Sequence, residues 1–166
     1  TGTKAITADA MTDGQTLTLT GSDAATLSFA NADIDASAYA GSLTVTGTGT
    51  TGQFTTGTAT SSISSTGATT IVATAMADDA TLSTSGAGAA TITGLQANLL
   101  VDDASTADIA VTLAAVATAT VALGTNTTGT KAITADAMTD GQILTLTGSD
   151  AATLSFVHSD VDASAY

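Results

Sequence analysis

The sequence TGTKAITADAMTDGQTLTLTGSDAATLSFANADIDASAY fills residues 1–39, and it returns at residues 128–166 as TGTKAITADAMTDGQILTLTGSDAATLSFVHSDVDASAY. The copies are identical at 34 of 39 positions, and the five differences are Thr16/Ile143, Ala30/Val157, Asn31/His158, Ala32/Ser159 and Ile34/Val161. An enzyme domain gains nothing from a near-copy of its own opening segment. In a tandem array, each unit offers its neighbour the surface that the neighbour needs. We therefore expect the chain to be a piece of a longer repetitive protein.

A weaker similarity lies between the two copies. The segment TADAMTDGQTLTLTGSDAATLS around Met11 aligns with VATAMADDATLSTSGAGAATIT around Met76, and Met138 stands at the matching place in the second copy. We interpret the 127-residue unit as two diverged half-units at residues 1–65 and 66–127. Residues 128–166 are then a partial copy of the first half-unit in one continuous repeat array. The methionines are expected to fill gaps in the core.

The composition restricts the core and the partners. Among 166 residues there is no Pro, Cys or Trp, and aromatic residues make up 3%, so the interior must consist of thin layers of Ile, Leu, Val and Ala. Fifteen acidic residues, all Asp, face only Lys4 and Lys131, which gives a net charge of −13. Such a surface repels phosphate backbones and anionic lipids. The longest apolar run, residues 109–123, is shorter than the roughly 20 residues that span a bilayer. We expect no nucleic-acid partner and no membrane insertion.

The apolar residues alternate with Thr, as they do in β-strands. Residues 17–20, 43–46, 91–93 and 144–147 would send aliphatic side chains to one face and hydroxyls to the other. Gly and Asp interrupt these runs every eight to eleven residues or so, which is typical of all-β folds. A half-unit is too short for a sandwich of about 100 residues. We predict a β-solenoid of stacked parallel coils of about 20 residues each.

Two alternatives remain open for the architecture. The chain could be a series of small antiparallel β modules in tandem. The segment from Gly47 to Gly67, which is low in complexity, could be a flexible linker between half-units. The spacing of Phe54 and Ile63 within it favours two thin strands instead.

Paired aspartates are the candidate metal ligands. Asp-x-Asp occurs in both copies, and side-chain oxygens at alternate positions could converge on Ca²⁺, a hard cation that takes six to eight oxygen ligands. An EF-hand loop does not fit, because Ala38 replaces its glycine and Thr44 its bidentate glutamate. The other interpretation is solvated aspartates that cap turns. The candidate calcium ligands are Asp33, Asp35, Asp160, Asp162, Asp102 and Asp103.

No pattern in the chain indicates catalysis. The single histidine, His158, stands where the first copy has Asn31, and the chain has no Cys or Glu, so neither a catalytic triad nor a zinc site can be assembled. Paired aspartates that hydrolyse glycosides need a sugar cleft, and the aromatic residues that usually line one are almost absent. We expect that the protein is not an enzyme.

Runs of Thr-x-Thr suggest a binding function. Such runs on a flat solenoid face could order water and bind ice, and the ranks would be residues 16–20, 44–48 and 56–60. The simpler interpretation is that Thr is the ordinary solvent-facing residue of a strand.

Several phrases resemble the repeat regions of large secreted bacterial surface proteins. These phrases are AATL at residues 24–27, DASAYAGSLTVT at 35–46 and VDASAY at 161–166. Calcium-dependent S-layer proteins and giant RTX-type adhesins exported by type I secretion have similar regions. The glycine-rich nonapeptide GGxGxDxUx of calcium rolls does not occur here. The resemblance implies a β-rich rod, calcium dependence and an extracellular, cell-surface location.

These observations together predict a structural module. It would be an S-layer lattice element or an adhesin stalk that acts by rigidity and by self-association with neighbouring copies of itself. The alternative function is an ice-binding or ligand-binding adhesin rod that uses outward Thr ladders.

Overall fold

The computed structural model describes residues 2–49, 52–96, 98–101, 108–116, 118–124 and 128–166. Every regular element within these residues is a β-strand. The strands form two parallel sheets. Sheet A contains β1 (Lys4–Ala8), β3 (Ala25–Phe29), β5 (Leu43–Gly47), β7 (Ser61–Ser65), β9 (Thr81–Ser85), β11 (Asn98–Val101), β13 (Thr118–Ala122), β15 (Ile143–Thr147) and β17 (Asp160–Ala165). Sheet B contains β2 (Thr16–Thr18), β4 (Asp33–Asp35), β6 (Gln53–Thr55), β8 (Thr69–Val72), β10 (Ala90–Leu95), β12 (Ile109–Leu113), β14 (Lys131–Thr134) and β16 (Ala152–Ser155).

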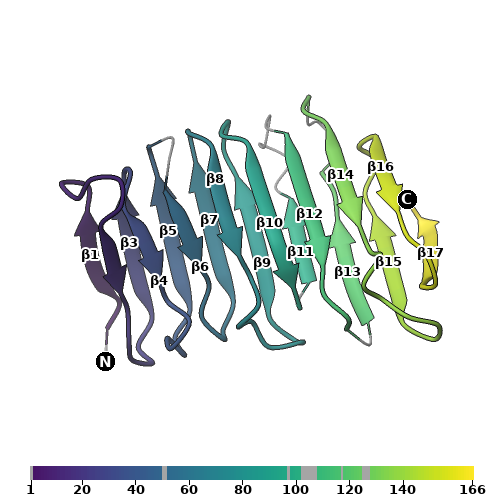
Figure 1. Cartoon of the computed structure of the whole chain (residues 1–166), viewed down its shortest axis with the longest axis horizontal. Coiled ribbons are helices and arrows are strands. Elements are labelled where there is room, and N and C mark those ends of the chain that lie inside the picture. The colour runs from purple at the N-terminus through teal and green to yellow at the C-terminus, as the bar shows by residue number, and fades with distance from the viewer. Residues whose placement is uncertain (1, 50–51, 97, 102–107, 117, 125–127) are drawn as a thin grey trace.

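Consecutive strands alternate between the two sheets, and each strand pairs in parallel with the strand two places further along the chain. One coil therefore consists of a strand in each sheet and the two turns that join them. The 17 strands of the described residues make about eight coils of about 20 residues each, and these stack into a rod that Figure 1 shows running from β1 to β17. The predicted β-solenoid is confirmed. The alternative of antiparallel modules is wrong, because every strand pair among the described residues is parallel.

Alternation of side chains builds the core. In β5, Leu43 and Val45 point inward, whereas Thr44 and Thr46 point to solvent. The strand register places Val45 between Leu27 and Ile63 of the neighbouring coils, so aliphatic side chains form columns along the rod. Burying one such side chain contributes roughly 1.5–3 kcal/mol. The core extends along the whole rod as one cluster, which accounts for stability without large aromatic side chains.

The low-complexity segment belongs to this stack and does not form a separate linker. Its described part contributes β6 and β7, the two strands that the spacing of Phe54 and Ile63 predicted, and both of these side chains are buried. The interior is more polar here than we expected. The buried hydroxyls of Thr56, Ser61 and Thr84 have no hydrogen-bond partner among the described residues. Each such group costs about 1–3 kcal/mol, so these middle coils are less stable than a purely aliphatic interior would make them.

The three methionines mark one recurring turn. The N–H groups of Met11, Met76 and Met138 each donate to the carbonyl oxygen three residues earlier, at 3.1, 3.4 and 3.0 Å. Met76 and Met138 are buried and Met11 is partly buried against the core, so their prediction as core residues is confirmed. The sheets also continue across the expected half-unit boundaries: β7 pairs with β9 on either side of residue 65, and β13 pairs with β15 on either side of residue 127.

The two copies of the repeated segment lie on opposite sheets. In the first copy, β1 and β3 belong to sheet A and β2 and β4 to sheet B. In the second copy, β14 and β16 belong to sheet B and β15 and β17 to sheet A. The cause is parity: β14 comes thirteen strands after β1, and an odd number of steps changes the sheet. The same sequence therefore faces one side of the rod near β1 and the other side near β17.

Candidate functional surfaces

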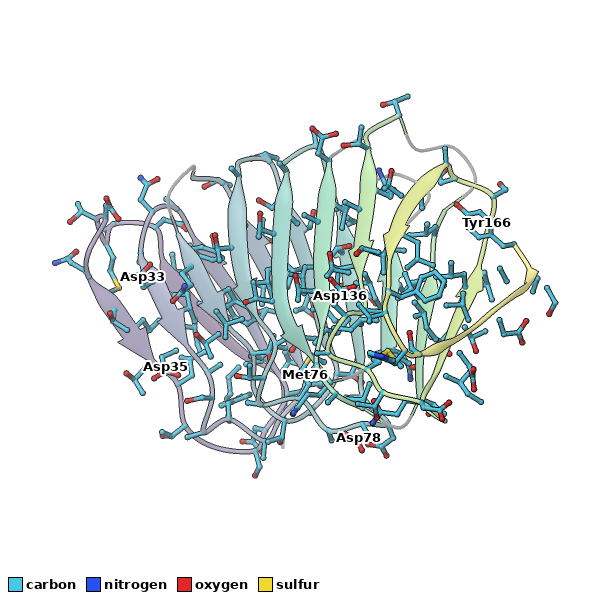
Figure 2. All side chains as sticks on the ribbon, turned by 45° about the vertical axis from the view of Figure 1, so that its right-hand side comes forward. Asp33, Asp35, Met76, Asp78, Asp136 and Tyr166 are labelled. Carbon is cyan, nitrogen blue, oxygen red and sulfur yellow. The ribbon has the colours of Figure 1, made fainter. Side chains whose placement is uncertain are left out.

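The first predicted aspartate pair lies on β4. Asp33 and Asp35 are two residues apart on this strand, so both side chains point outward from sheet B, near the β1 end of the rod (Figure 2). The Gln53 N–H donates to Asp33 Oδ1 at 3.0 Å. The hydroxyl and N–H of Ser37 donate to Asp35 Oδ1 at 2.6 and 3.0 Å. The Ser37 hydroxyl, and after it the Ser37 N–H, lower the pKa of Asp35, because both bonds stabilise its ionised form.

The second pair lies on β17, at the opposite end and on the opposite sheet. The Ser164 N–H donates to Asp162 Oδ1 at 3.0 Å, which repeats the arrangement at Asp35. This backbone bond and, after it, the Ser164 hydroxyl lower the pKa of Asp162. Asp160 precedes it by two residues on the same strand. The third predicted pair, Asp102 and Asp103, lies outside the described residues.

The structure brings neither described pair together with a third acidic, histidine or cysteine side chain of the described residues. Within the described ranges there is no group of three or more His, Cys, Asp or Glu side chains that could hold a metal ion. Each pair supplies two carboxylates, whereas Ca²⁺ takes six to eight oxygens. Calcium binding therefore stays a prediction. The observed role of each is to accept a hydrogen bond from the serine two residues later: Asp35 caps the turn after β4, whereas Asp162 bonds Ser164 within β17.

Other aspartates link neighbouring coils, a role that was not among the predictions from the sequence. The hydroxyls of Ser28 and Ser155 donate to Asp9 and Asp136 of the preceding coil, at 2.6 and 3.0 Å. The N–H and hydroxyl of Thr130 donate to Asp108 Oδ1 at 2.7 and 2.9 Å. These bonds, the backbone one first, lower the pKa of Asp108. The spacing of about 20 residues between an Asp and a Ser or Thr is the sequence signal for such links.

An uncharged hydroxyl face covers part of sheet A. Four consecutive strands of this sheet carry only Thr or Ser at their outward positions, and the register aligns these residues in two columns. Neighbouring hydroxyl side chains are spaced about 4.8 Å across the strands and about 6.7 Å along them. We call this surface the hydroxyl face, and its residues are Thr26, Ser28, Thr44, Thr46, Ser62, Ser64, Ser83 and Ser85.

The predicted Thr ranks do not form a single surface. Residues 16–18 lie on sheet B and residues 44–46 on sheet A, so these two ranks face opposite sides of the rod. Residues 56–60 form a turn between β6 and β7, and Thr56 is buried. The alternation of Thr in the sequence continues through this turn, so the pattern wrongly predicts a strand face at residues 56–60.

A further surface lies at the β17 end of the rod. Phe156 and Tyr166 are 49% and 44% exposed, and Leu154 and Val161 beside them are only partly buried. We call these four residues the end face. Strands β16 and β17 each have one neighbour, β14 and β15, so the outer edge of each is unpaired among the described residues. An exposed apolar surface beside two open strand edges is a typical site for pairing with further β-structure.

The remaining functional expectations concern single residues and the membrane. His158 is exposed in the turn between β16 and β17. No helix in the described part of the chain is long and apolar enough to cross a membrane. Comparisons of this sequence with models of protein families, with curated proteins and with solved structures find no match.

Proposed function

We propose that the chain is a structural repeat module of an extracellular bacterial surface protein, as an S-layer lattice element or an adhesin stalk. It would act by rigidity, by length and by self-association with neighbouring copies. The single observation that carries this proposal is that both copies of the repeated segment are coils of one uninterrupted solenoid. A further unit then adds length without any new architecture, because each coil pairs with its neighbours in the same way.

Rigidity would follow from the two continuous sheets. One sheet has nine strands and the other has eight, and the core passes through all of them. Each coil advances the rod by about 4.8 Å, the spacing of paired strands. A unit of thirteen strands is six and a half coils, so it would add about 31 Å.

The charge of the surface suits a role outside the cell as part of an ordered layer. With a net charge of −13, rods in solution repel one another, which keeps them apart until they are assembled. In this proposal Ca²⁺ reduces the repulsion between the aspartates of adjacent rods and so permits lateral association.

The length of multi-unit chains tests the rod. Chains with one, two and three 127-residue units should lengthen by about 31 Å per unit at constant cross-section, as measured by small-angle scattering and negative-stain electron microscopy. Their melting temperatures should change little beyond the second unit, because each unit contacts only its neighbours. Particles that grow equally in all dimensions would contradict the proposal.

The same multi-unit chains test whether calcium promotes lateral association. Electron micrographs and thermal melts in calcium and in chelator would be compared with those of a variant that carries Asn at positions 33, 35, 160 and 162. We expect sheets or bundles in calcium only, and fewer of them for the variant. Identical particles and identical melting temperatures in both conditions would remove calcium from the proposal and leave a plain stalk.

The hydroxyl face supports a second candidate function. Its eight side chains form a regular, rigid and uncharged lattice that could hold ordered water and so bind ice. Replacing Thr44 and Thr46 by Leu would then abolish inhibition of ice recrystallisation. The matched control replaces Thr16 and Thr18, which lie on sheet B, and should retain it. Absence of inhibition by the unmodified chain would eliminate this function.

A further inference from the structure

The end face is present twice in the molecule, once exposed and once covered. Its four residues are Leu154, Phe156, Val161 and Tyr166, and Figure 2 shows Tyr166 at the end of the rod. Their counterparts in the first copy are Leu27, Phe29, Ile34 and Tyr39, which are 2%, 1%, 1% and 5% exposed. Three of these pairs have identical side chains, and the fourth differs by one methylene group. The difference in burial therefore comes from what lies on top of them.

The covering coil in the first copy is residues 40–60. Val45 pairs with Leu27 and Gly47 with Phe29 as β5 aligns with β3. Phe54 of β6 pairs with Ile34 of β4. Beyond the strands, the Thr58 N–H donates to the carbonyl oxygen of Tyr39 at 3.0 Å. The structure thus contains a bound form of this surface with its occupant in place.

Three glycines make the fit specific. A Cβ atom on Gly52 would lie 2.6 Å from Cε2 of Phe29, and one on Gly47 would lie 3.2 Å from Cζ of the same ring. A Cβ atom on Gly57 would overlap the carbonyl oxygen of Tyr39. A coil with larger residues at these three positions would require the Phe29 ring and the Tyr39 backbone to shift, which weakens its pairing. The surface therefore selects among β-strand sequences.

We infer that the end face is a docking surface, and that its occupant is a coil with the sequence of residues 40–60, continuing the chain from Tyr166. This inference rests on the proposed function, since it names the partner that a neighbouring repeat would supply. The sheet that each strand of the docked coil would extend is determined as well. Because β16 lies on sheet B, the strand equivalent to β5 would extend sheet B, whereas β5 itself lies on sheet A. Successive repeats would then present the hydroxyl face alternately on the two sides of the rod.

The experiment compares the full chain with a chain extended after Tyr166 by the sequence of residues 40–72. This extension contains neither Tyr nor Trp, so tyrosine fluorescence still reports only Tyr39 and Tyr166. Docking should reduce acrylamide quenching of Tyr166 and should slow amide exchange in β16 by at least about tenfold. A matched control extension carries Val at the three glycine positions and should give neither effect.

A second variant keeps the test independent of how well the extension folds. The variant is Phe156→Ala in the extended chain. If the extension does not pack on Phe156, this substitution should leave the amide exchange of the extension unchanged. If docking occurs as inferred, this substitution should restore fast exchange to the extension while β1 to β13 stay protected. Unchanged exchange and quenching in the extended chain, or equal protection by the valine control, would overturn the inference.

The outcomes also separate this inference from the proposed function. Multi-unit chains that form rods while the end face stays exposed would overturn the inference alone. Compact multi-unit particles would contradict the proposed function whatever happens at the end face. Sedimentation of the unextended chain tests a second copy of the chain as the occupant. Dimers that bury Tyr166 and that persist after extension would assign the end face to that second copy. Such a result would overturn the inferred occupant.

Discussion

Phe29 and Phe156 share the sequence SDAATLSF, yet one ring is 1% exposed and the other is 49% exposed. The two copies of the repeated segment form corresponding strands, although the bounds of these strands differ, and their Met11 and Met138 turns are hydrogen-bonded alike. They differ in their neighbours: the first copy has coils after it, and the second has coils before it. Local sequence therefore determines the path of each coil, whereas the adjacent coils determine how much each residue stabilises the rod. Substitutions at matched positions can measure that second contribution directly.

The largest difference is expected at the phenylalanines. Phe29→Ala should lower the free energy of unfolding by about 3–5 kcal/mol, because it opens a cavity in the core. Phe156→Ala should lower it by less than about 1 kcal/mol, because much of that ring already contacts solvent. Urea unfolding followed by circular dichroism measures both. Equal losses would show that Phe156 is buried in solution by a partner or by a different end structure.

At Gly21 and Gly148 the larger loss of stability is expected in the second copy, opposite to the order at the phenylalanines. Both have positive φ, 124° and 106°, so alanine is strained at either position. A Cβ atom on Gly21 would approach only Tyr39, at 3.7 Å, whereas one on Gly148 would overlap the carbonyl oxygen of Leu123 in the preceding coil. We expect Gly148→Ala to cost at least about 2 kcal/mol more than Gly21→Ala. The difference in urea midpoint between these variants isolates the contact between coils, and a difference near zero would mean that the turns separate.

For the lysines near the start of each copy, substitution is again expected to cost more stability in the second copy. Lys4 is exposed, and its Nζ lies 3.7 Å from Asp23 Oδ2, so Lys4→Ala should change stability by less than about 1 kcal/mol. Lys131 is buried between Ile109 and Ala152, and its charge helps to lower the pKa of Asp108. Lys131→Ala should therefore cost more, about 1–3 kcal/mol. Lys131→Met, which keeps most of the stem, separates the packing part from the charge. A Met variant as unstable as the Ala variant would assign the whole effect to the charge.

Much of this architecture could be predicted from the sequence, because a solenoid repeats its local signals. Alternation in residues 43–46 and glycines at regular spacing identify the strands and turns, and the spacing of Phe54 and Ile63 predicted the two strands β6 and β7. The change of sheet between the copies could not be predicted, because it depends on whether the number of strands is odd. A single short strand such as β6, with three residues, changes that parity if it is missed.

The candidate site residues could be predicted less well. Asp33 and Asp35 do lie side by side on one strand, as the Asp-x-Asp pattern indicated. Whether their oxygens converge with others depends on neighbouring coils, and there the sequence places Thr16 and Thr55 opposite them, not further carboxylates. The end face had no sequence signal of its own, because its residues are the same as those that form the core in the first copy.

The smallest difference is expected at Asp35 and Asp162. Their hydrogen bonds with Ser37 and Ser164 are local to each copy, so loss of either should have the same small effect, whatever coils adjoin it. Both have a pKa below the ordinary value, so the ionised form is favoured in the folded state. Their contribution is therefore complete above about pH 5, where the unfolded carboxylates are also ionised, and is lost as the pH falls through the lower folded pKa. Thermal melts at neutral and acidic pH should show less acid destabilisation for Asp35→Asn and Asp162→Asn than for the unmodified chain, and by equal amounts. A markedly larger effect of Asp162→Asn would mean that this aspartate also binds something beyond its own turn.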